Sequence, residues 1–352
     1  MKGRLSICLG VFSIMALSNV IVPILPLYAT GSTLQGAIYS VYFLGAFLIT
    51  VPAGILSDWY GRVPVMRSGL FLTILSGVLL VPVTTPLIVL GVRLLEGISA
   101  GLFVAAAMAH VNSQNDHERM SGYFMAALNL GLMLGLVIGG FLATHLSLQS
   151  SGVILFTLLT FIPGILSVFL VEGMPLRQYY TPRVIINLLW DYRWIWYSAT
   201  VLIGITGVII SLYPEYSHMS PDILGIWIAG MSAATIASVL FISRIAIQPV
   251  PAIRIAAVFM AGGVLVSFFS PAGFIIVGAV AGVVMIAQMD FLAHVRKNQG
   301  AVMGLFSTTS YLGMSVLPFI AGLIADTTTF FLAFCATALI SLTVSCTIRK
   351  NV

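Results

Sequence analysis

Charge is what this sequence has least of. Only 7% of its 352 residues are Asp, Glu, Lys or Arg, whereas 60% are hydrophobic, and the mean hydropathy is +1.11. Because a water-soluble domain carries roughly 25% charged residues, a soluble fold of this length is excluded. The apolar segments must lie in lipid, where only helices or closed barrels satisfy the backbone. These segments run for about 20 residues without alternating with polar ones, so we expect membrane-spanning helices.

The residue patterns of most enzymes are also missing. Cys8, Cys335 and Cys346 lie in apolar segments without a CxxC pair, so neither a disulfide framework nor a metal site is expected. No HExxH motif, no Cys–His arrangement and no acidic metal cluster occurs, and none of the lysines follows the glycines of a P-loop. We therefore expect no enzymatic activity, no cofactor, no bound metal and no nucleic-acid partner.

About twelve apolar windows are long enough to cross a bilayer. The first follows Lys2 and Arg4, as in a signal peptide, but it is long for one and has a counterpart later in the chain, so we interpret it as a helix. Links such as Ser270 between two windows leave no room for a soluble domain. The predicted spans are 5–28, 34–56, 63–83, 86–110, 120–142, 152–171, 194–213, 222–243, 250–269, 271–292, 301–325 and 330–347.

Basic residues predict how the chain lies in the membrane. With the amino terminus inside, every Lys and Arg except Arg93 falls on the inner side of the predicted spans, and the predicted outer loops have none. Cytoplasmic loops carry such an excess of Lys and Arg. We therefore predict a multi-pass protein of the cell membrane, with both termini in the cytoplasm. We expect it to be a monomer that binds a small-molecule substrate.

An internal repeat divides the sequence into halves. The segment 120–131 aligns with the segment that begins at Met303, at an offset of about 182 residues, so that Gly131 stands opposite Gly313. Residues 24–28 similarly parallel residues 212–216. Two parallel six-helix halves are a transporter architecture with a central pathway. The predicted parts are an amino-terminal six-helix bundle (1–172), a cytoplasmic linker (173–193) and a carboxy-terminal six-helix bundle (194–352).

Three motifs stand in consecutive predicted helices. They read Gly54-Ile-Leu-Ser-Asp58-Trp-Tyr-Gly61-Arg62, then Arg93-Leu-Leu-Glu96-Gly97, then Gly131-Leu-Met-Leu-Gly135-Leu-Val-Ile-Gly139-Gly140. Together they resemble the G-x-x-x-D-x-x-G-R, R-x-x-[QE]-G and G-x-x-x-G-P-x-x-G-G motifs of the major facilitator superfamily. The third motif is typical of its drug/proton antiporter branch. With the duplication, the resemblance covers nearly the whole chain. It implies an all-α membrane fold of twelve transmembrane helices in two pseudo-symmetric six-helix bundles.

The chain departs from the family's pattern at three places. Trp59 stands where the first motif has a basic residue, and Leu136 replaces the proline of the third. Many antiporters of this branch place an acid in span one, where this chain has only Asn19. This departure leaves open whether protons couple through that helix.

The first motif is interpreted as a gate. The resemblance implies that Asp58 faces the amino end of span eleven, near residues 300–303, and holds an inner gate shut, while Arg62 extends the contact to Asp116 or Glu118. Gly54 would let another helix approach closely. The alternative is an ordinary tight turn with basic residues at the inner surface. The predicted gating residues are Gly54, Asp58, Gly61 and Arg62.

Arg93 is the most informative single residue, because an Arg at the centre of a span costs at least about 2.5 kcal/mol. It either contacts substrate or tunes a proton site in a water-filled cavity, or it snorkels to the outer interface, or Glu96 three residues on neutralises it. Glu96 is the best intramembrane proton carrier in the sequence.

Other polar and small residues complete the expected pathway. Asn19, Asn129 and Tyr311 are expected to face the cavity. Four glycines of span five, at Gly131, Gly135, Gly139 and Gly140, either bend the helix or only pack it against a neighbour. Gln288 and Asp290 close span ten on the inner side, and we interpret them as solvated. The predicted substrate or proton pathway thus comprises Arg93, Glu96, Asn19, Asn129 and Tyr311.

These observations predict a secondary transporter that works by alternating access. Proton-coupled export of lipophilic or cationic compounds is the version we expect first. A uniporter or an importer of a small metabolite stays open, because span one has no acid. A receptor or scaffold with the same fold but without flux is the alternative from a different class.

Overall fold

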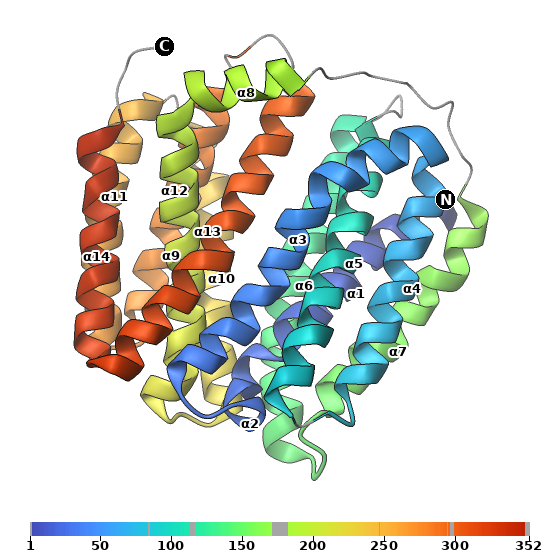
Figure 1. Ribbon diagram of the computed structural model, residues 1–352, viewed down its shortest axis with the longest axis horizontal. Helices are drawn as coiled ribbons and strands as arrows, with labels where there is room; N and C mark the ends of the chain where they lie inside the picture. Colours follow the sequence, from blue (N-terminus) through green and yellow to red (C-terminus); the bar gives the residue numbers. More distant parts are fainter. Residues whose placement is uncertain are drawn as a thin grey trace. The chain divides into compact units, whose positions relative to one another are not determined.

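The computed structural model describes residues 2–83, 85–112, 117–170, 182–245, 247–293, 295 and 299–348. In these ranges all regular structure is helical, as Figure 1 shows. Twelve helices within them are long and apolar enough to cross a membrane. The prediction of an all-α membrane protein with twelve spans is therefore confirmed.

The helices lie close to the predicted windows. In the first half they are α1 (Lys2–Val20), α2 (Leu25–Tyr28), α3 (Ser32–Tyr60), α4 (Arg62–Leu80), α5 (Pro86–Asn112), α6 (His117–His145) and α7 (Ser151–Leu166), with 3-10 turns at Val22–Ile24 and Ser167–Phe169. In the second half they are α8 (Pro182–Asp191), α9 (Arg193–Ser217), α10 (Pro221–Ile242), α11 (Pro249–Phe269), α12 (Gly273–Ala293), α13 (Gln299–Thr327) and α14 (Phe330–Thr347).

Proline explains where the first predicted span differs from the structure. The predicted span 5–28 is confirmed as one membrane-crossing segment, Arg4–Tyr28, but it is not one uniform helix, because α1 ends at Val20 and a 3-10 turn precedes the short α2. Pro23 and Pro26 fall in these two segments. Proline has no backbone N–H and clashes with the preceding helical turn, which accounts for the interruption of the helix there.

The predicted linker contains a helix that the apolar windows did not predict. α8 begins with Pro182, whose missing N–H is harmless at the first helical position. The Trp196 side-chain N–H donates to the Leu188 carbonyl at 3.0 Å and ties α8 to α9. Figure 1 shows α8 crossing the end of α9 and its neighbours. The earlier part of the predicted linker, residues 171–181, lies outside the described residues.

The chain divides into two compact units. The first unit contains Met1–Ala29, Val41–Gln178 and His218–Ala229. The second unit contains Thr30–Ser40, Tyr179–Ser217 and Gly230–Val352. Two helices therefore change unit along their length, since the first residues of α3 belong to the second unit and the first residues of α10 belong to the first. The division otherwise runs close to the middle of the chain.

The two units repeat the same packing scheme. In the first unit α1 packs against α6 and α7, and α4 packs against α5. In the second unit α9 packs against α13 and α14, and α11 packs against α12. Close helix contacts of this kind are made by small residues, which let backbones approach. A Cβ built on Gly131 would lie 2.3 Å from the Phe12 carbonyl oxygen, and one on Gly313 would lie 1.9 Å from that of Thr200.

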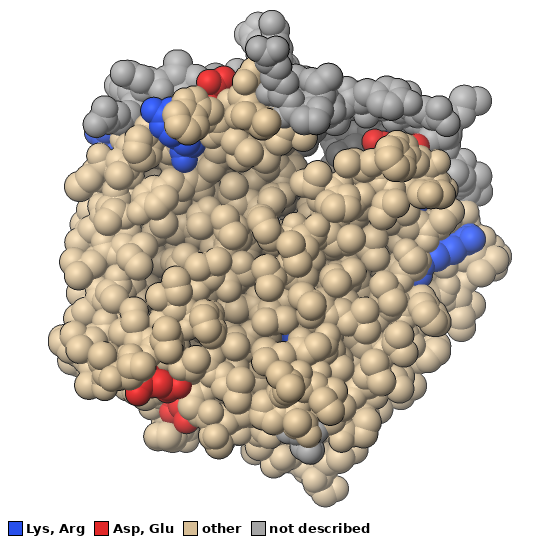
Figure 2. All heavy atoms as spheres, viewed as in Figure 1, with Lys and Arg blue, Asp and Glu red and all other residues tan. Residues whose placement is uncertain are grey.

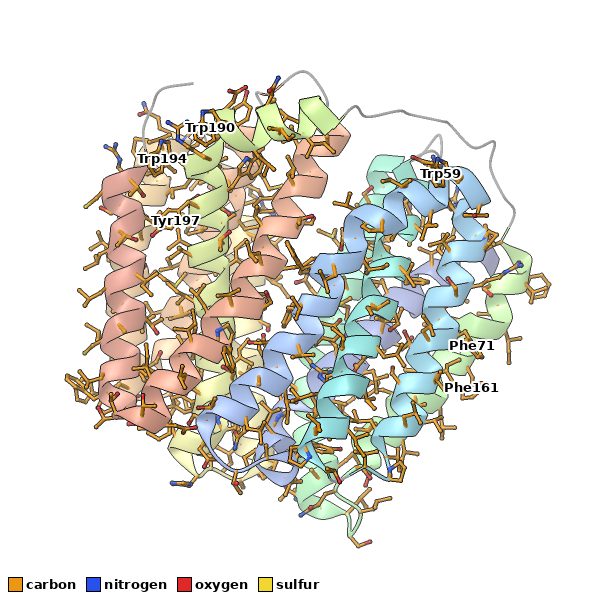
Figure 3. All side chains as sticks on the ribbon, in the orientation of Figure 1. Trp59, Phe71, Phe161, Trp190, Trp194 and Tyr197 are labelled. Carbon is orange, nitrogen blue, oxygen red and sulfur yellow. The ribbon has the colours of Figure 1, made fainter. Side chains whose placement is uncertain are left out.

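The outward surface of the helices is apolar. Phe71 on α4 is 66% exposed, and in Figure 3 it lies near Phe161 of α7 along the length of the helices. On the face drawn in Figure 2, Lys, Arg, Asp and Glu are confined to small patches, and the wide surface between them is almost wholly uncharged. Large exposed apolar surfaces mark interaction with membranes or partners. This surface suits the lipid that the helix lengths predict.

Candidate functional site

The candidate site is the buried ion pair of α5. One terminal nitrogen of Arg93 donates to Glu96 Oε2 at 2.7 Å, and each side chain is only 1% exposed. The two residues are three apart in a helix, so their side chains lie on the same face. The prediction that Glu96 neutralises Arg93 is confirmed. Snorkelling of Arg93 to the interface is wrong for this structure, because its side chain has almost no exposed surface.

The ion pair is held against α3. The Arg93 guanidinium lies over the Tyr42 ring, 4.7 Å from the ring centroid, which adds a cation–π contact. This contact depends on Gly97, one turn further along α5, where a Cβ would lie 1.8 Å from the Tyr42 carbonyl oxygen. Any larger residue at Gly97 would push α3 away.

The two carboxylate oxygens of Glu96 differ in their hydrogen bonding. Its Oε1 is buried and, among the described residues, has no hydrogen-bond partner. A buried carboxylate oxygen without a donor costs free energy, and such groups are rare in native structures. Around it, Thr73 donates to Ser99 at 3.0 Å, and Ser99 donates to the Glu96 carbonyl at 2.6 Å. Glu96 is therefore the acid at this site that can take up another donor, a proton or a cation.

Backbone geometry explains the first motif only in part. Gly61 separates α3 from α4 with φ +97°, a conformation that glycine adopts far more readily than other residues. Asp58 interacts electrostatically with Arg62. The expected close helix approach at Gly54 is not found, because a Cβ there would meet no described atom within 4 Å.

The remaining parts of the gate stay a prediction. The contact of Asp58 with the start of span eleven is one of them. The predicted contact of Arg62 with Asp116 or Glu118 is another. Asp116 lies outside the described residues, and the side chain of Glu118 is not described.

The glycines of the third motif pack α6 onto α1. A Cβ on Gly135 would lie 2.3 Å from the Ala16 carbonyl oxygen, and one on Gly139 would lie 2.9 Å from that of Val20. Asn19 joins the same contact, since its side-chain amide donates to the Leu132 carbonyl at 3.1 Å. Gly140 meets a different neighbour, the Pro221 carbonyl oxygen at the start of α10. The close packing expected at these glycines is therefore present, and bending of α6 at them stays a prediction.

The other predicted pathway residues lie on other helices than the ion pair. The Asn129 side-chain amide donates to the Met125 carbonyl of its own helix at 2.8 Å. Tyr311 lies on α13 in the second unit. The prediction that Gln288 is solvated is wrong, because its side chain is fully buried and its amide donates to the Ser198 hydroxyl oxygen at 3.0 Å. Tyr42 was missed, since nothing in its local sequence marks it as a partner of Arg93.

Comparison with known proteins identifies similar sequences. The family model of the Major Facilitator Superfamily matches residues 7–318. The multi-drug resistance efflux pump PmrA of Streptococcus pneumoniae serotype 4 is 31% identical over 223 residues, 55% of this chain and 54% of PmrA. Quinolone resistance protein NorB of Staphylococcus aureus is 28% identical over 139 residues, 39% of this chain and 29% of NorB. The matches thus span about half the length of the first curated relative and less of the second.

Solved structures of similar fold cover the chain more fully. The nucleoside transporter NupG has a TM-score of 0.76 and 15% identity, covering 98% of both chains. The D-xylose-proton symporter has a TM-score of 0.75 and 14% identity, covering 100% of this chain and 97% of the other. At these identities the likeness is one of fold.

Proposed function

The chain belongs to the Major Facilitator Superfamily, and from that premise we propose that it exports lipophilic or cationic compounds in exchange for protons. It is a multi-pass membrane transporter of a small molecule and not an enzyme. The proposal adds a direction, a substrate class and a coupling ion. The relatives in sequence support the direction, because PmrA is named a multi-drug resistance efflux pump and NorB a quinolone resistance protein.

The observation that carries the proposal is the Arg93–Glu96 pair. Both groups are 1% exposed, and taking two charges out of water costs several kcal/mol per ion, which good geometry only partly offsets. Charged residues within membrane spans are rare and usually functional. A pair kept at this cost in a helix that could be apolar points to a role in transport.

The charges of the pair suit an exchange of cation for proton. With Glu96 ionised, the pair is formally neutral, and the second carboxylate oxygen can accept a donor. When Glu96 takes up a proton, the charge of Arg93 is no longer compensated and opposes another cation nearby, because charges interact strongly in a low-dielectric interior. Binding of a cationic substrate and of a proton would therefore exclude each other. Such exclusion is the requirement for antiport.

The transport cycle that we propose is alternating access between the two predicted bundles, 1–172 and 194–352. Both termini and the linker would lie in the cytoplasm, and the protein would act as a monomer in the cell membrane. Asn19, Asn129 and Tyr311 would line the pathway, and Gly54, Asp58, Gly61 and Arg62 would form the inner gate. Arg93 and Glu96 supply the coupling chemistry in this scheme.

A uniporter or importer is the second candidate. The only polar residue in the later part of α1 besides serine is Asn19, whose side chain is committed to the Leu132 carbonyl, so no acid on this helix supports coupling. The structural neighbours also include a nucleoside transporter and a xylose–proton symporter. These observations favour a coupling site confined to Glu96, or no coupling at all.

Proteoliposomes that contain a pH-sensitive dye distinguish these candidates. Tetraphenylphosphonium serves as the lipophilic cation, and an imposed pH gradient as the driving force. We expect the wild-type protein to exchange the cation for protons, and Glu96→Gln to lose this coupling. Asp191→Asn is the matched control, since it makes the same change on α8, outside the spans, and should transport normally.

Three results would reject the antiport proposal. Unchanged exchange by Glu96→Gln would remove Glu96 from the mechanism. Cation flux without proton movement in the wild type would favour the uniporter. Absence of flux for a broad panel of compounds would favour the receptor or scaffold.

A further inference from the structure

The start of α3 is bound by two carboxylates from other helices of the second unit. Asp326 of α13 accepts from the Ser32 amide at 2.9 Å with one oxygen and from the Thr33 amide at 2.7 Å with the other. Glu215 of α9 accepts from the Gly31 amide at 3.3 Å. The first amides of a helix have no partners within it and carry the positive end of its dipole. Two acids from outside the helix thus supply the cap.

Close backbone packing surrounds this cap. A Cβ on Gly322 would lie 2.4 Å from the Ser32 carbonyl oxygen, and one on Gly36 would lie 2.7 Å from that of Pro318. Gly31 has φ +87°, which turns its amide and the next two toward the carboxylates. The side-chain amide of Gln35 also donates to Glu215. The whole first part of α3 is therefore fitted to α9 and α13.

Glu215 and Asp326 are bound by backbone amides at the start of α3 and not by a basic side chain. Apart from Arg93, every Lys and Arg of the sequence falls toward the opposite, predicted inner, ends of the spans. Glu215 and Asp326 therefore have no cation close to them in the sequence. Hydrogen bonds to a charged acceptor are about twice as strong as neutral ones, so the α3 amides are substantial partners for these acids.

A weaker copy of the contact exists in the first unit. The start of α10 lies on the end of α6, where the Thr144 hydroxyl oxygen accepts from the Asp222 amide at 3.3 Å. Thr144 stands opposite Asp326 at the repeat offset of about 182 residues, just as Gly140 stands opposite Gly322. The repeat has therefore kept the place of the contact and changed its chemistry from a hydroxyl to a carboxylate.

The helices that make these contacts are the two that change unit. The first residues of α3 belong to the second unit and the rest of α3 to the first, while α10 is divided the opposite way. If the units move against each other, either these helices bend or the contacts at their starts break. Breaking hydrogen bonds to a helix end takes less free energy than breaking a helix, since a cap contributes only about 0.5–2 kcal/mol.

We propose that Asp326 and Glu215 form a latch that holds the predicted outer end of α3 on α9 and α13 and must open during each transport cycle. The latch deepens the alternating-access part of the proposed function and does not depend on the substrate or the coupling ion. Its counterpart at Thr144 is the weaker of the two. Opening at α3 therefore sets the balance between the latched and unlatched forms.

A thiol-labelling rate measures the latch without transport. Cys8, Cys335 and Cys346 are first replaced by Ala, and Ser32→Cys is then introduced as a reporter, because Ser32 is fully buried in the latched form. The purified protein in lipid nanodiscs is open to reagent from both sides. We expect Asp326→Ala to speed labelling by a maleimide at least about threefold, as loss of a cap contact implies. Asp326→Asn, which keeps an acceptor oxygen, should restore most of the protection.

Three further variants decide the interpretation. Glu215→Gln should speed labelling by a smaller factor, and Thr144→Val should change it least. A second reporter, Ser341→Cys, is fully buried between α14 and α11 in the same unit and should keep its slow rate in every variant.

Unchanged labelling of Ser32→Cys in both Asp326→Ala and Glu215→Gln would overturn the latch. Equal acceleration at Ser341→Cys would overturn it as well, because the contact would then only support the fold. Asp191→Asn, on α8 and outside the spans, should leave both rates unchanged. The latch is thus tested separately from proton-coupled export.

Discussion

Gly97 of the first unit and Gly278 of the second make the same helix contact, but their neighbours differ in chemistry. A Cβ on Gly97 would lie 1.8 Å from the Tyr42 carbonyl oxygen of α3, and one on Gly278 would lie 2.1 Å from the Met231 carbonyl oxygen of α10. The residues four and one positions before Gly97 in α5 are Arg93 and Glu96. The second unit has Phe274 and Val277 at these places.

The second unit shows that this fold does not require charge at these positions. Phe274 and Val277 are fully buried, and the centroid of the Phe274 ring lies 4.5 Å from that of Tyr213 on α9. Well-packed apolar residues often replace a buried ion pair with no loss of stability. The pair in α5 is therefore better explained by the proposed role in transport than by folding. Exchanging the residues of one unit for those of the other tests this explanation.

The largest effect is expected from removal of one charge alone. Glu96→Ala leaves the Arg93 guanidinium buried without its carboxylate, which should lower stability by about 3–5 kcal/mol. The double variant Arg93→Phe with Glu96→Val, which copies the second unit, should recover most of this loss. Thermal unfolding of the purified proteins measures both. A double variant as unstable as Glu96→Ala would show that the two units are not interchangeable here.

The glycine contacts should be equally sensitive in both units. Gly131→Val and Gly313→Val each drive a side chain into a carbonyl oxygen, at Phe12 and Thr200, and overpacking of this kind costs about 1–3 kcal/mol or more. The yield of folded protein and its melting temperature measure the effect.

The repeat also supplies matched controls for these glycines. A Cβ at Gly122 or at Gly304, its repeat counterpart, meets no described atom within 4 Å. Alanine at either position should therefore leave the melting temperature unchanged or raise it slightly. A large difference between Gly131→Val and Gly313→Val would contradict the equivalence of the two contacts.

The junctions after α3 and α10 should differ in their need for glycine. Gly61 alone separates α3 from α4, whereas the link from α10 to α11 runs from Ile242 to Pro249. Gly61→Ala should cost about 1–3 kcal/mol, because φ +97° with ψ +153° is a backbone region that is essentially limited to glycine. Gly54→Ala, in the open part of α3, should be neutral or slightly stabilising. Equal melting temperatures for the two variants would show that the positive φ at Gly61 carries no strain for alanine.

The smallest effect is expected at Asn19. Its hydrogen bond to the Leu132 carbonyl joins α1 to α6, whereas the corresponding position of α9 is Gly207, which packs on Tyr39 and Pro318. Hydrogen bonds between membrane helices average about 0.6 kcal/mol, so Asn19→Leu should lower the melting temperature only slightly. Chemical denaturation resolves an effect of this size. A loss of several kcal/mol would mean that Asn19 does more than join two helices.

Sequence patterns predict what is local and repeated in this protein. The twelve spans follow from the length of the apolar runs, and the glycine spacing of α6 predicts a close helix contact. The partners could not be predicted, because Tyr42 lies far from Arg93 in the chain and no rule of spacing joins them. The cap of α3 is more extreme, since Thr33 and Asp326 are 293 residues apart. α8 was missed because it is too short to register as a span.

Proton release on substrate binding tests the role of the ion pair most directly. Tetraphenylphosphonium is added to purified protein in weak buffer, and a pH-sensitive dye follows the proton concentration. Wild-type protein equilibrated at an acidic pH, at which Glu96 is protonated, should release protons as the cation binds, because the cation and a protonated Glu96 exclude each other. The double variant Arg93→Phe with Glu96→Val should unfold at a similar temperature and release none. Equal release from both proteins would contradict the account.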